Sequence, residues 1–306
     1  MTRWLQSLLL VPALLALPAW ALDISPVQVA PGVYAVIGEL GGRTYENEGL
    51  NANVGFIVTD EGVVVVDSGA SYQSARKLHE AIRRTTDRPV KWVINTGGQD
   101  HRWLGNGYFR EQGAEIIAHA KAKADMEARG ADQLAALAPV LKEKLDGTRA
   151  VLPTRTFTDR LVLAPGGREI QVIHFGAGHT PGDSVVWLPK ERVLFTGDLV
   201  YVERLLGVIP VSSVKSWLAA FDAMAKLEPR TVVPGHGAVC DLGKARRDTY
   251  DYLVLLRTHM KKAVADFVDL QRAIDSLDQS AFARLANYDD LKGGNASRAY
   301  LEAEAE

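Results

Sequence analysis

The sequence predicts an α/β (α+β) protein in which two mixed sheets pack face to face between outer helices, a four-layer αββα sandwich. Short apolar strands alternate with amphipathic helices along most of the 306 residues. Residues 63–66 are all valine, so this strand must lie inside a sheet with both faces covered. A second run of short strands, separated by Pro and Gly turns, follows a helical stretch. The pattern alone does not distinguish this sandwich from other layered α/β folds.

The first 21 residues are typical of a secretory signal peptide. Arg3 gives a positive start, residues 5–17 form an apolar run, and Ala19-Trp20-Ala21 matches a small-x-small cleavage pattern. The run is shorter than the ~20 residues of a membrane-spanning helix, so we expect cleavage and no stable membrane insertion, with an uncleaved anchor as the alternative. We therefore expect a periplasmic or secreted protein. Its mature chain, residues 22–306, is predicted to form a single domain.

The first half of the mature chain combines strands with one amphipathic helix. The turn Asp60-Glu61-Gly62 joins two of the strands, and apolar residues at helical spacing predict a helix over residues 74–85. The predicted strands cover residues 33–37, 53–59, 63–67, 90–95 and 115–118.

A helical insert is predicted at about residues 120–146, which are rich in Ala, Leu, Lys and Glu. Gly130 and Pro139 predict breaks in it. A further helix is expected over residues 214–227, and a charged, mainly helical C-terminal extension over about 242–306. The strands of this half are expected at residues 156–163, 169–175, 184–188, 193–196 and 231–233.

The charge and the cysteine content limit the possible partners and cross-links. The formal net charge is -2, and no large basic block offers nucleic acid a binding surface, so we expect no nucleic-acid partner. The single cysteine, Cys240, excludes an intramolecular disulfide and is best interpreted as a small buried hydrophobe. Nothing in the sequence indicates an oligomeric state.

Four polar segments follow apolar strands, where side chains at the carboxyl edge of a sheet share a crevice. Each alone has an ordinary structural explanation as a turn or loop. Together, their imidazoles and carboxylates, flanked by glycines that allow close backbone approach, predict ligands for a divalent metal. The segments are residues 95–106, Gly178–Asp183, Thr196-Gly197-Asp198 and Pro234-Gly235-His236-Gly237.

This ordered series resembles the metallo-β-lactamase superfamily of hydrolases. The similarity covers most of residues 28–240 and includes Asp67, at the end of the valine strand. The family fold is the αββα sandwich, in agreement with the pattern above. In the family, the loop that corresponds to residues 95–106 carries His-x-His-x-Asp-His. Its first two histidines serve one metal, and its Asp-His pair serves a second.

This sequence departs from that motif. Aligned with a gap, the Asp-His pair becomes Asp100-His101, and the two preceding histidine positions become Thr96 and Gly98. Neither residue can replace imidazole.

Aligned without a gap, the histidine positions become Gly97 and Gln99, and the Asp-His positions become His101 and Arg102. The first histidine pair is therefore absent in either alignment. We prefer the gapped one, because a permanently charged Arg102 in a ligand position would repel a cation. The resemblance then implies one metal site, with His179 nearby as a further candidate ligand. Its predicted ligands are Asp100, His101, Asp198 and His236.

The resemblance implies a hydrolase that activates water with one zinc ion, or with iron, to cleave an ester, amide or related bond in a small substrate. Asp100 is the candidate general base, and His179 is the candidate to orient water or protonate a leaving group. Candidate arginines for an anionic substrate group are Arg102, Arg129, Arg149 and Arg155.

Two other functions are open. The missing histidines favour a binding or accessory protein that has kept the fold and lost turnover. The third hypothesis is a mononuclear non-haem iron oxygenase with His179, His236 and Asp198 as ligands.

Overall fold

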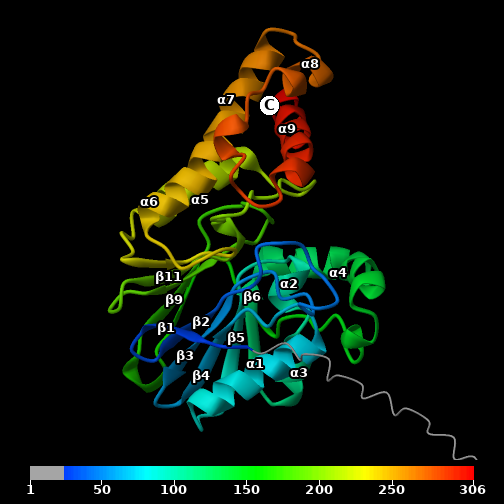
Figure 1. The fold of residues 1–306 in the computed structure, drawn as a ribbon. Coiled ribbons are helices and arrows are strands. Elements are labelled where there is room, and N and C mark those ends of the chain that lie inside the picture. The colour runs from blue at the N-terminus through cyan, green and yellow to red at the C-terminus, as the bar shows by residue number, and fades with distance from the viewer. Residues whose placement is uncertain (1–23) are drawn as a thin grey trace, which may run out of the picture.

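The computed structural model describes residues 24–306 and confirms the predicted fold: two sheets packed face to face between outer helices (Figure 1). The predicted signal peptide, residues 1–21, lies outside the described residues. Its cleavage and the export of the chain stay predictions.

The first sheet follows the order of the chain. Its first four strands are antiparallel to their neighbours, and β4 to β7 are parallel, so helices must connect the parallel ones. Its strands are β1 (Val27–Ala30), β2 (Val33–Val36), β3 (Val54–Thr59), β4 (Gly62–Val66), β5 (Val90–Asn95), β6 (Glu115–His119) and β7 (Arg155–Phe157).

The second sheet has the order β12-β11-β10-β9-β8, in which only β11 and β12 are parallel. Its strands are β8 (Arg160–Leu163), β9 (Ile170–Ile173), β10 (Val185–Leu188), β11 (Val193–Phe195) and β12 (Thr231–Val233).

One predicted strand, residues 156–163, is two strands in different sheets. β7 pairs with β6 in the first sheet, and β8 pairs with β9 in the second. The chain crosses between the sheets at Thr158-Asp159. The local sequence is β-prone on both sides of this step, so the prediction of one strand was wrong about pairing rather than about conformation.

The valine strand β4 is buried on both faces, as its composition predicts. Val63 and Val65 pack under the helices outside the first sheet, whereas Val64 and Val66 face the second sheet. Alternate side chains of a strand point to opposite faces, so four consecutive valines serve two cores at once.

Helices cover both outer faces. α1 (Tyr72–Thr85) and α3 (Asn106–Glu111) lie against the first sheet. α5 (Val214–Ala225) and the C-terminal helices pack on the second sheet, and α7, α8 and α9 project beyond it (Figure 1). The C-terminal helices are α6 (Leu242–Ala245), α7 (Asp251–Ala265), α8 (Leu270–Asp275) and α9 (Tyr288–Glu304), with a π turn, η4 (Arg246–Tyr250), after α6 and a 3-10 turn, η5 (Ser280–Phe282), before α9.

The predicted helical insert is one helix, α4 (Ala120–Leu141), followed by the 3-10 turn η1 (Lys142–Leu145). The predicted breaks at Gly130 and Pro139 are absent from it. A Cβ on Gly130 would lie 2.9 Å from the Trp103 ring, so the glycine allows α4 to pack closely on that side chain. Pro139 falls two residues before the helix end, where its missing N–H leaves little further helix to disturb.

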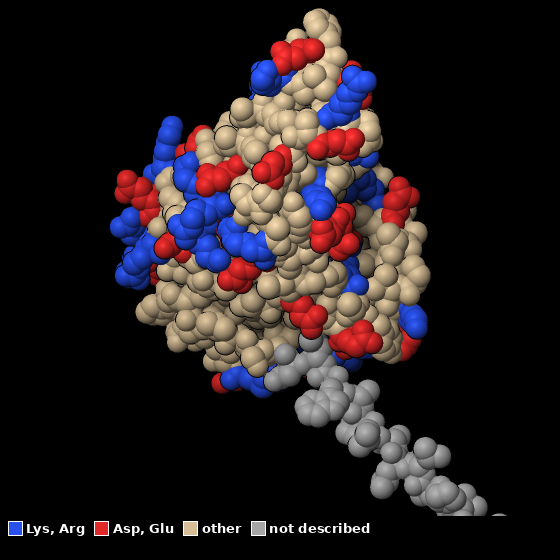
Figure 2. All heavy atoms as spheres, turned by 45° about the horizontal axis from the view of Figure 1, so that its top comes forward, with Lys and Arg blue, Asp and Glu red and all other residues tan. Residues whose placement is uncertain are grey.

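Basic and acidic side chains are interspersed on the face that Figure 2 presents, apart from small local groups of one sign. Within residues 24–306, no helix has the length and apolar character needed to cross a bilayer.

A substitution at Gly55, where the two sheets pack closely, tests this packing. A Cβ at this β3 position would lie 2.4 Å from the Phe195 ring of β11 and 2.7 Å from the Tyr34 carbonyl oxygen. Gly55→Ala should therefore destabilise the protein by about 1–3 kcal/mol, as measured by urea unfolding. Gly294→Ala, at an exposed site of α9 with open space around it, should stabilise the protein by about 0.5–1 kcal/mol. Equal effects of the two variants would contradict this packing.

Candidate functional site

The predicted polar segments meet at one edge of the sandwich. Since β4 and β5 are parallel, and β11 and β12 are parallel, the loops after each pair emerge at the same edge of their sheets. Hydrogen bonds then join the two sheets there. The Ser184 N–H donates to the Thr96 carbonyl at 2.7 Å, and the Asn53 amide donates to the Pro234 carbonyl at 2.8 Å.

A buried arginine lies at the centre of this edge. Arg102, in the short helix α2 (Asp100–Trp103), is 1% exposed. Its Nη1 lies 3.1 Å from Asp67 Oδ2, and its Nη2 lies 2.5 Å from Asp198 Oδ1. Burial acts to lower the pKa of Arg102, but Asp198 and Asp67 outweigh it and raise the pKa, so the guanidinium stays charged.

Thr96 also helps to hold Asp67 in place. Asp67 directly follows β4 with a left-handed φ of 64°, which is strained for a non-glycine residue. Its carboxylate accepts hydrogen bonds from the Thr96 N–H and the Thr96 hydroxyl, both at 2.7 Å. The strain therefore persists because three donors, two from Thr96 and one from Arg102, fix the carboxylate.

Three of the predicted ligands come together. His101, Asp198 and His236 each offer a ligand atom, and these atoms lie within 4.8 Å of one another. His101 Nε2 is 3.1 Å from Asp198 Oδ2, and His236 Nε2 is 3.3 Å from Asp198 Oδ1. Asp198 belongs to the 3-10 turn η3 (Gly197–Leu199), and all three residues are buried. Two imidazoles and a carboxylate are a donor set that suits zinc.

His236 has the tautomer that a metal ligand needs. Its Nδ1 donates to the Asn51 carbonyl at 2.6 Å, which leaves the lone pair on Nε2 facing Asp198. Burial lowers its pKa to about 3, so the ring is neutral. Tyr201 stacks on this ring with centroids 4.5 Å apart, and the Val202 N–H bonds the His236 carbonyl, so the segment after η3 fixes the histidine.

Asp100 lies beside this group and not within it. Its Oδ1 accepts hydrogen bonds from Arg43 Nη2 and from the backbone N–H of His101, in the first turn of α2. Burial acts to raise the pKa of Asp100, but Arg43 and His101 outweigh it and lower the pKa to about 2. The ligand and general-base roles of Asp100 stay predictions.

The ring of His101 has two alternative proton positions. Its Nδ1 lies 3.2 Å from Arg43 Nη2 and 3.2 Å from Asp100 Oδ1. A proton on Nδ1 would be accepted by Asp100 and would leave Nε2 free to bind a cation. A proton on Nε2 would be shared with Asp198 instead. Asp100 can therefore favour the metal-binding tautomer of His101 without being a ligand.

His179 lines the same pocket but is not in the three-residue group. Its Nδ1 donates to the Gly207 carbonyl at 2.8 Å, so Nε2 carries the lone pair. Burial lowers the pKa of His179, which keeps the ring neutral and able to accept a proton. Its role as a ligand or catalytic group stays a prediction.

The space of the absent histidine pair is filled by other groups. A Cβ on Gly97 would lie 2.6 Å from Asp183 Oδ1, and one on Gly98 would lie 2.2 Å from Asp125 Oδ2. Thr96 is bonded to Asp67, and Gln99 contacts Arg129 and Asp100. A histidine side chain at Gly97 or Gly98 would collide with these carboxylates.

The site opens into a small pocket of about 260 Å³, lined by His101, His179, His236, Tyr201, Asn51, Arg43 and Arg204 among others. The sequence analysis did not find Arg43, Asn51, Tyr201 or Arg204, because they lie on loops outside the motif segments. Of the four arginines it proposed, Arg102 is buried at the site, whereas Arg129, Arg149 and Arg155 pair with Asp125, Glu111 and Glu115.

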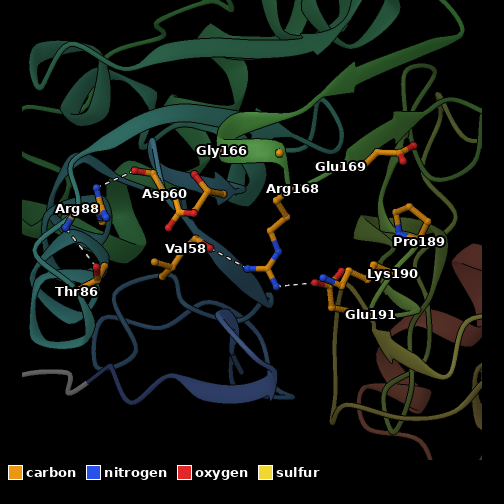
Figure 3. Close-up of a pocket in the computed structure, with 12 residues that line it drawn as sticks. Val58, Asp60, Thr86, Arg88, Gly166, Arg168, Glu169, Pro189, Lys190 and Glu191 are labelled. Carbon is orange, nitrogen blue, oxygen red and sulfur yellow. Dashed lines mark hydrogen bonds and ion pairs between the residues drawn. The ribbon is translucent and has the colours of Figure 1, made fainter.

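A larger cavity of about 610 Å³ lies at the other end of β4, next to the Asp60 turn and the 3-10 turn η2 (Pro165–Gly167) (Figure 3). Its arginines are already bonded. Arg168 contacts the Val58 carbonyl and Glu191, and Arg88 bonds the Asp60 carbonyl. It includes none of the three clustered ligands, so the chemistry points to the smaller pocket.

Comparison with known proteins agrees with this fold. The family model described as "Metallo-beta-lactamase superfamily" matches residues 47–236. The chain belongs to the metallo-beta-lactamase superfamily. The superfamily match spans Asp67, His101, Asp198 and His236.

Several relatives share moderate identity. The chain is 28% identical to Metallo-beta-lactamase IND-1 of Chryseobacterium indologenes, over 69% of this chain and 80% of that protein. It is 29% identical to the 2,4-dinitroanisole O-demethylase subunit alpha of a Nocardioides strain, over 58% of this chain and 50% of that protein. A metallo-beta-lactamase structure from Pontibacter korlensis aligns with a TM-score of 0.60 at 24% identity, covering 76% of this chain and 99% of that one, which shows the shared fold.

Removing the buried arginine should destabilise the whole edge. Arg102→Met leaves two buried carboxylates without their cation, so we expect a loss of about 3–5 kcal/mol in the free energy of unfolding. Arg155→Met removes an arginine from an exposed pair with Glu115 and should cost less than about 1 kcal/mol. Denaturant titration of both variants measures this, and equal losses would contradict the central position of Arg102.

Asp183 should make stability depend on pH. Burial raises its pKa to about 7 from the ordinary 3.8, although Thr180 donates to its carboxylate. A raised folded-state pKa gives stability that is present below about pH 4 and is lost as pH rises through about 7. The melting temperature of Asp183→Asn should therefore fall less than that of the wild type between these pH values. The exposed control Asp159→Asn should follow the wild type, and parallel curves for all three proteins would contradict the assignment.

Proposed function

We propose that the chain is an exported, metal-dependent hydrolase that binds a single zinc ion through His101, Asp198 and His236. Its substrate is a small molecule with an ester, amide or related bond, and its location is periplasmic or secreted. The observation that carries the proposal is the buried His-Asp-His group, with ligand atoms within 4.8 Å of one another. Membership of a superfamily of hydrolases supports the reaction class.

The donor set fits a catalytic rather than a structural zinc ion. Three protein ligands leave one coordination position open for water or substrate. His236 presents an unprotonated Nε2, and Asp198 is ionised because Arg102 and His101 hold its pKa well below the ordinary value, against the effect of burial. A zinc ion bound there would lower the pKa of a water molecule and polarise a substrate oxygen.

The surrounding residues have separate roles in this proposal. Arg102 holds Asp198 through Oδ1, so the other carboxylate oxygen remains for the cation. Asp100 orients His101 and is the candidate general base. His179 Nε2 is the candidate to orient the attacking water, or to take its proton and pass that proton to the leaving group. Iron suits the same ligands, so metal analysis decides the identity of the ion.

The Arg102–Asp198 ion pair also favours a second function. A guanidinium already neutralises part of the charge that a metal needs, and the first histidine pair is missing. These two features together favour a binding or accessory protein that has kept the fold without turnover.

Metal content separates the two functions. The purified mature protein, dialysed against trace zinc, should contain about one equivalent of zinc by mass spectrometry and hydrolyse 4-nitrophenyl acetate in a chelator-sensitive way. His236→Ala should retain less than about a tenth of that zinc, because one of three ligands is lost. His259→Ala, which removes a histidine of α7 far along the chain, is the matched control and should keep both metal and activity.

A wild-type protein without zinc or iron would support the binding function. An unchanged zinc content in folded His236→Ala would contradict the ligand assignment. Iron together with oxygen consumption would support the oxygenase in place of the hydrolase.

A further inference from the structure

One cation of the pocket has no counter-ion. Arg204 is partly buried, and no carboxylate of residues 24–306 forms an ion pair with it. Its Nη1 donates to the carbonyl oxygens of Leu40 and Gly41 at 3.2 and 2.6 Å, and its Nε is buried without a partner. Carbonyl oxygens bind the guanidinium but do not cancel its charge. A partly buried cation without a balancing anion is costly, and burial lowers the pKa of Arg204 accordingly.

The other arginine of the pocket differs from it. Arg43 is paired with Asp100 and is therefore balanced. The arginines first considered for anion binding are also paired, each with a carboxylate. Of the two arginines that line the pocket, Arg204 is therefore the one that has no carboxylate counter-ion in residues 24–306.

Two neutral groups in the same pocket also lack partners. Asn51 is 4% exposed, and its side-chain oxygen is buried without a hydrogen bond. Tyr201 is 3% exposed and lines the pocket, and its hydroxyl forms no hydrogen bond with residues 24–306. A tyrosine hydroxyl carries its proton at neutral pH and can donate a hydrogen bond. The buried side-chain atoms of this pocket that have no hydrogen-bond partner in the described chain are Arg204 Nε, Arg43 Nε and Asn51 Oδ1. Buried polar groups in native proteins are nearly always bonded, so three such atoms in one pocket indicate a missing ligand, whose donor groups would face the Asn51 oxygen.

These groups share the pocket with His101, His179 and His236. We propose that the substrate of this site carries a small negatively charged oxygen group, a carboxylate or a phosphate, which Arg204 and the Tyr201 hydroxyl bind beside the three histidines. This inference rests on the proposed hydrolase function and names its substrate class. The pocket of about 260 Å³ is small, so the anionic group and the reacting bond must lie close together.

A pair of esters with equal acyl length tests the charge preference. The mono-4-nitrophenyl ester of succinic acid is anionic, whereas 4-nitrophenyl butyrate is neutral. The wild type should have the larger kcat/KM for the anionic ester. Arg204→Gln should lower the ratio of the two kcat/KM values by about tenfold to hundredfold, the size expected for a hydrogen bond to a charged group. Tyr201→Phe should lower the ratio by a smaller factor, because it removes one neutral donor. Arg149→Gln, which removes the same charge from an exposed pair, should leave the ratio unchanged.

Binding without turnover gives the second readout. Isothermal titration of the purified protein with monomethyl succinate, methyl phosphate and dimethyl succinate compares the two anions with a neutral ligand. The wild type should bind at least one anion more tightly than dimethyl succinate, and the tighter anion identifies the group. Arg204→Gln should weaken that binding at least tenfold.

The two proposals can fail separately. Anion binding that depends on Arg204, without hydrolysis of either ester, would contradict the hydrolase and leave the anion pocket standing. Metal-dependent hydrolysis with the same ratio in the wild type and Arg204→Gln, and equal anion binding by both, would overturn this inference and leave the hydrolase standing.

Discussion

The ion pairs of Arg102 with Asp67 and Asp198 are the interaction on which the rest of the site depends. The guanidinium also donates to the carbonyl oxygens of Asn53 and Gly235. It therefore joins segments that adjoin β3, β4, β11 and β12, which belong to both sheets. A charge buried this deeply is stable only when its partners surround it, so the loops at this edge are held in one arrangement.

That arrangement decides what the site can bind. Asp198 gives one oxygen to Arg102, and its other oxygen faces His101. Asp183 and Asp125 fill the space beside Gly97 and Gly98, so no second set of imidazoles can form there. The metal ion that we propose at His101, Asp198 and His236 would lie beside this fixed guanidinium. Arg204 lies on the wall of the same pocket as His101 and His236. The proposed metal site and the proposed anion site are therefore parts of one site.

Sequence reasoning predicted the features that local pattern determines. The valines of β4 could be placed on two faces because alternation is a property of the strand itself. The positions of Asp198 and His236 after strands were also readable, since each follows an apolar run and a glycine. The switch between sheets at Thr158 depends on long-range pairing that no local signal records. The same holds for Gly130, whose packing against Trp103 keeps α4 continuous.

The loop of residues 95–106 shows most clearly what sequence reasoning could not predict. Charge reasoning excluded Arg102 from a metal site because it considered the arginine without its two carboxylate partners. With Asp67 and Asp198 beside it, the arginine is a stable part of the site, and Asp100 turns to Arg43 instead. Nothing in the sequence indicated that the pocket includes Arg204, Tyr201 and Asn51. A polar group without a partner can be recognised only when its surroundings are known.

Anomalous diffraction at the zinc absorption edge, from crystals of the mature protein grown with zinc, tests the central claim most directly. The account predicts one peak, about 2.0–2.2 Å from nitrogen atoms of His101 and His236 and an oxygen of Asp198. Arg102 should remain bonded to Asp67 and Asp198. A second peak beside Gly97 and Gln99, no peak between the three ligands, or an Arg102 side chain displaced from both carboxylates would contradict it.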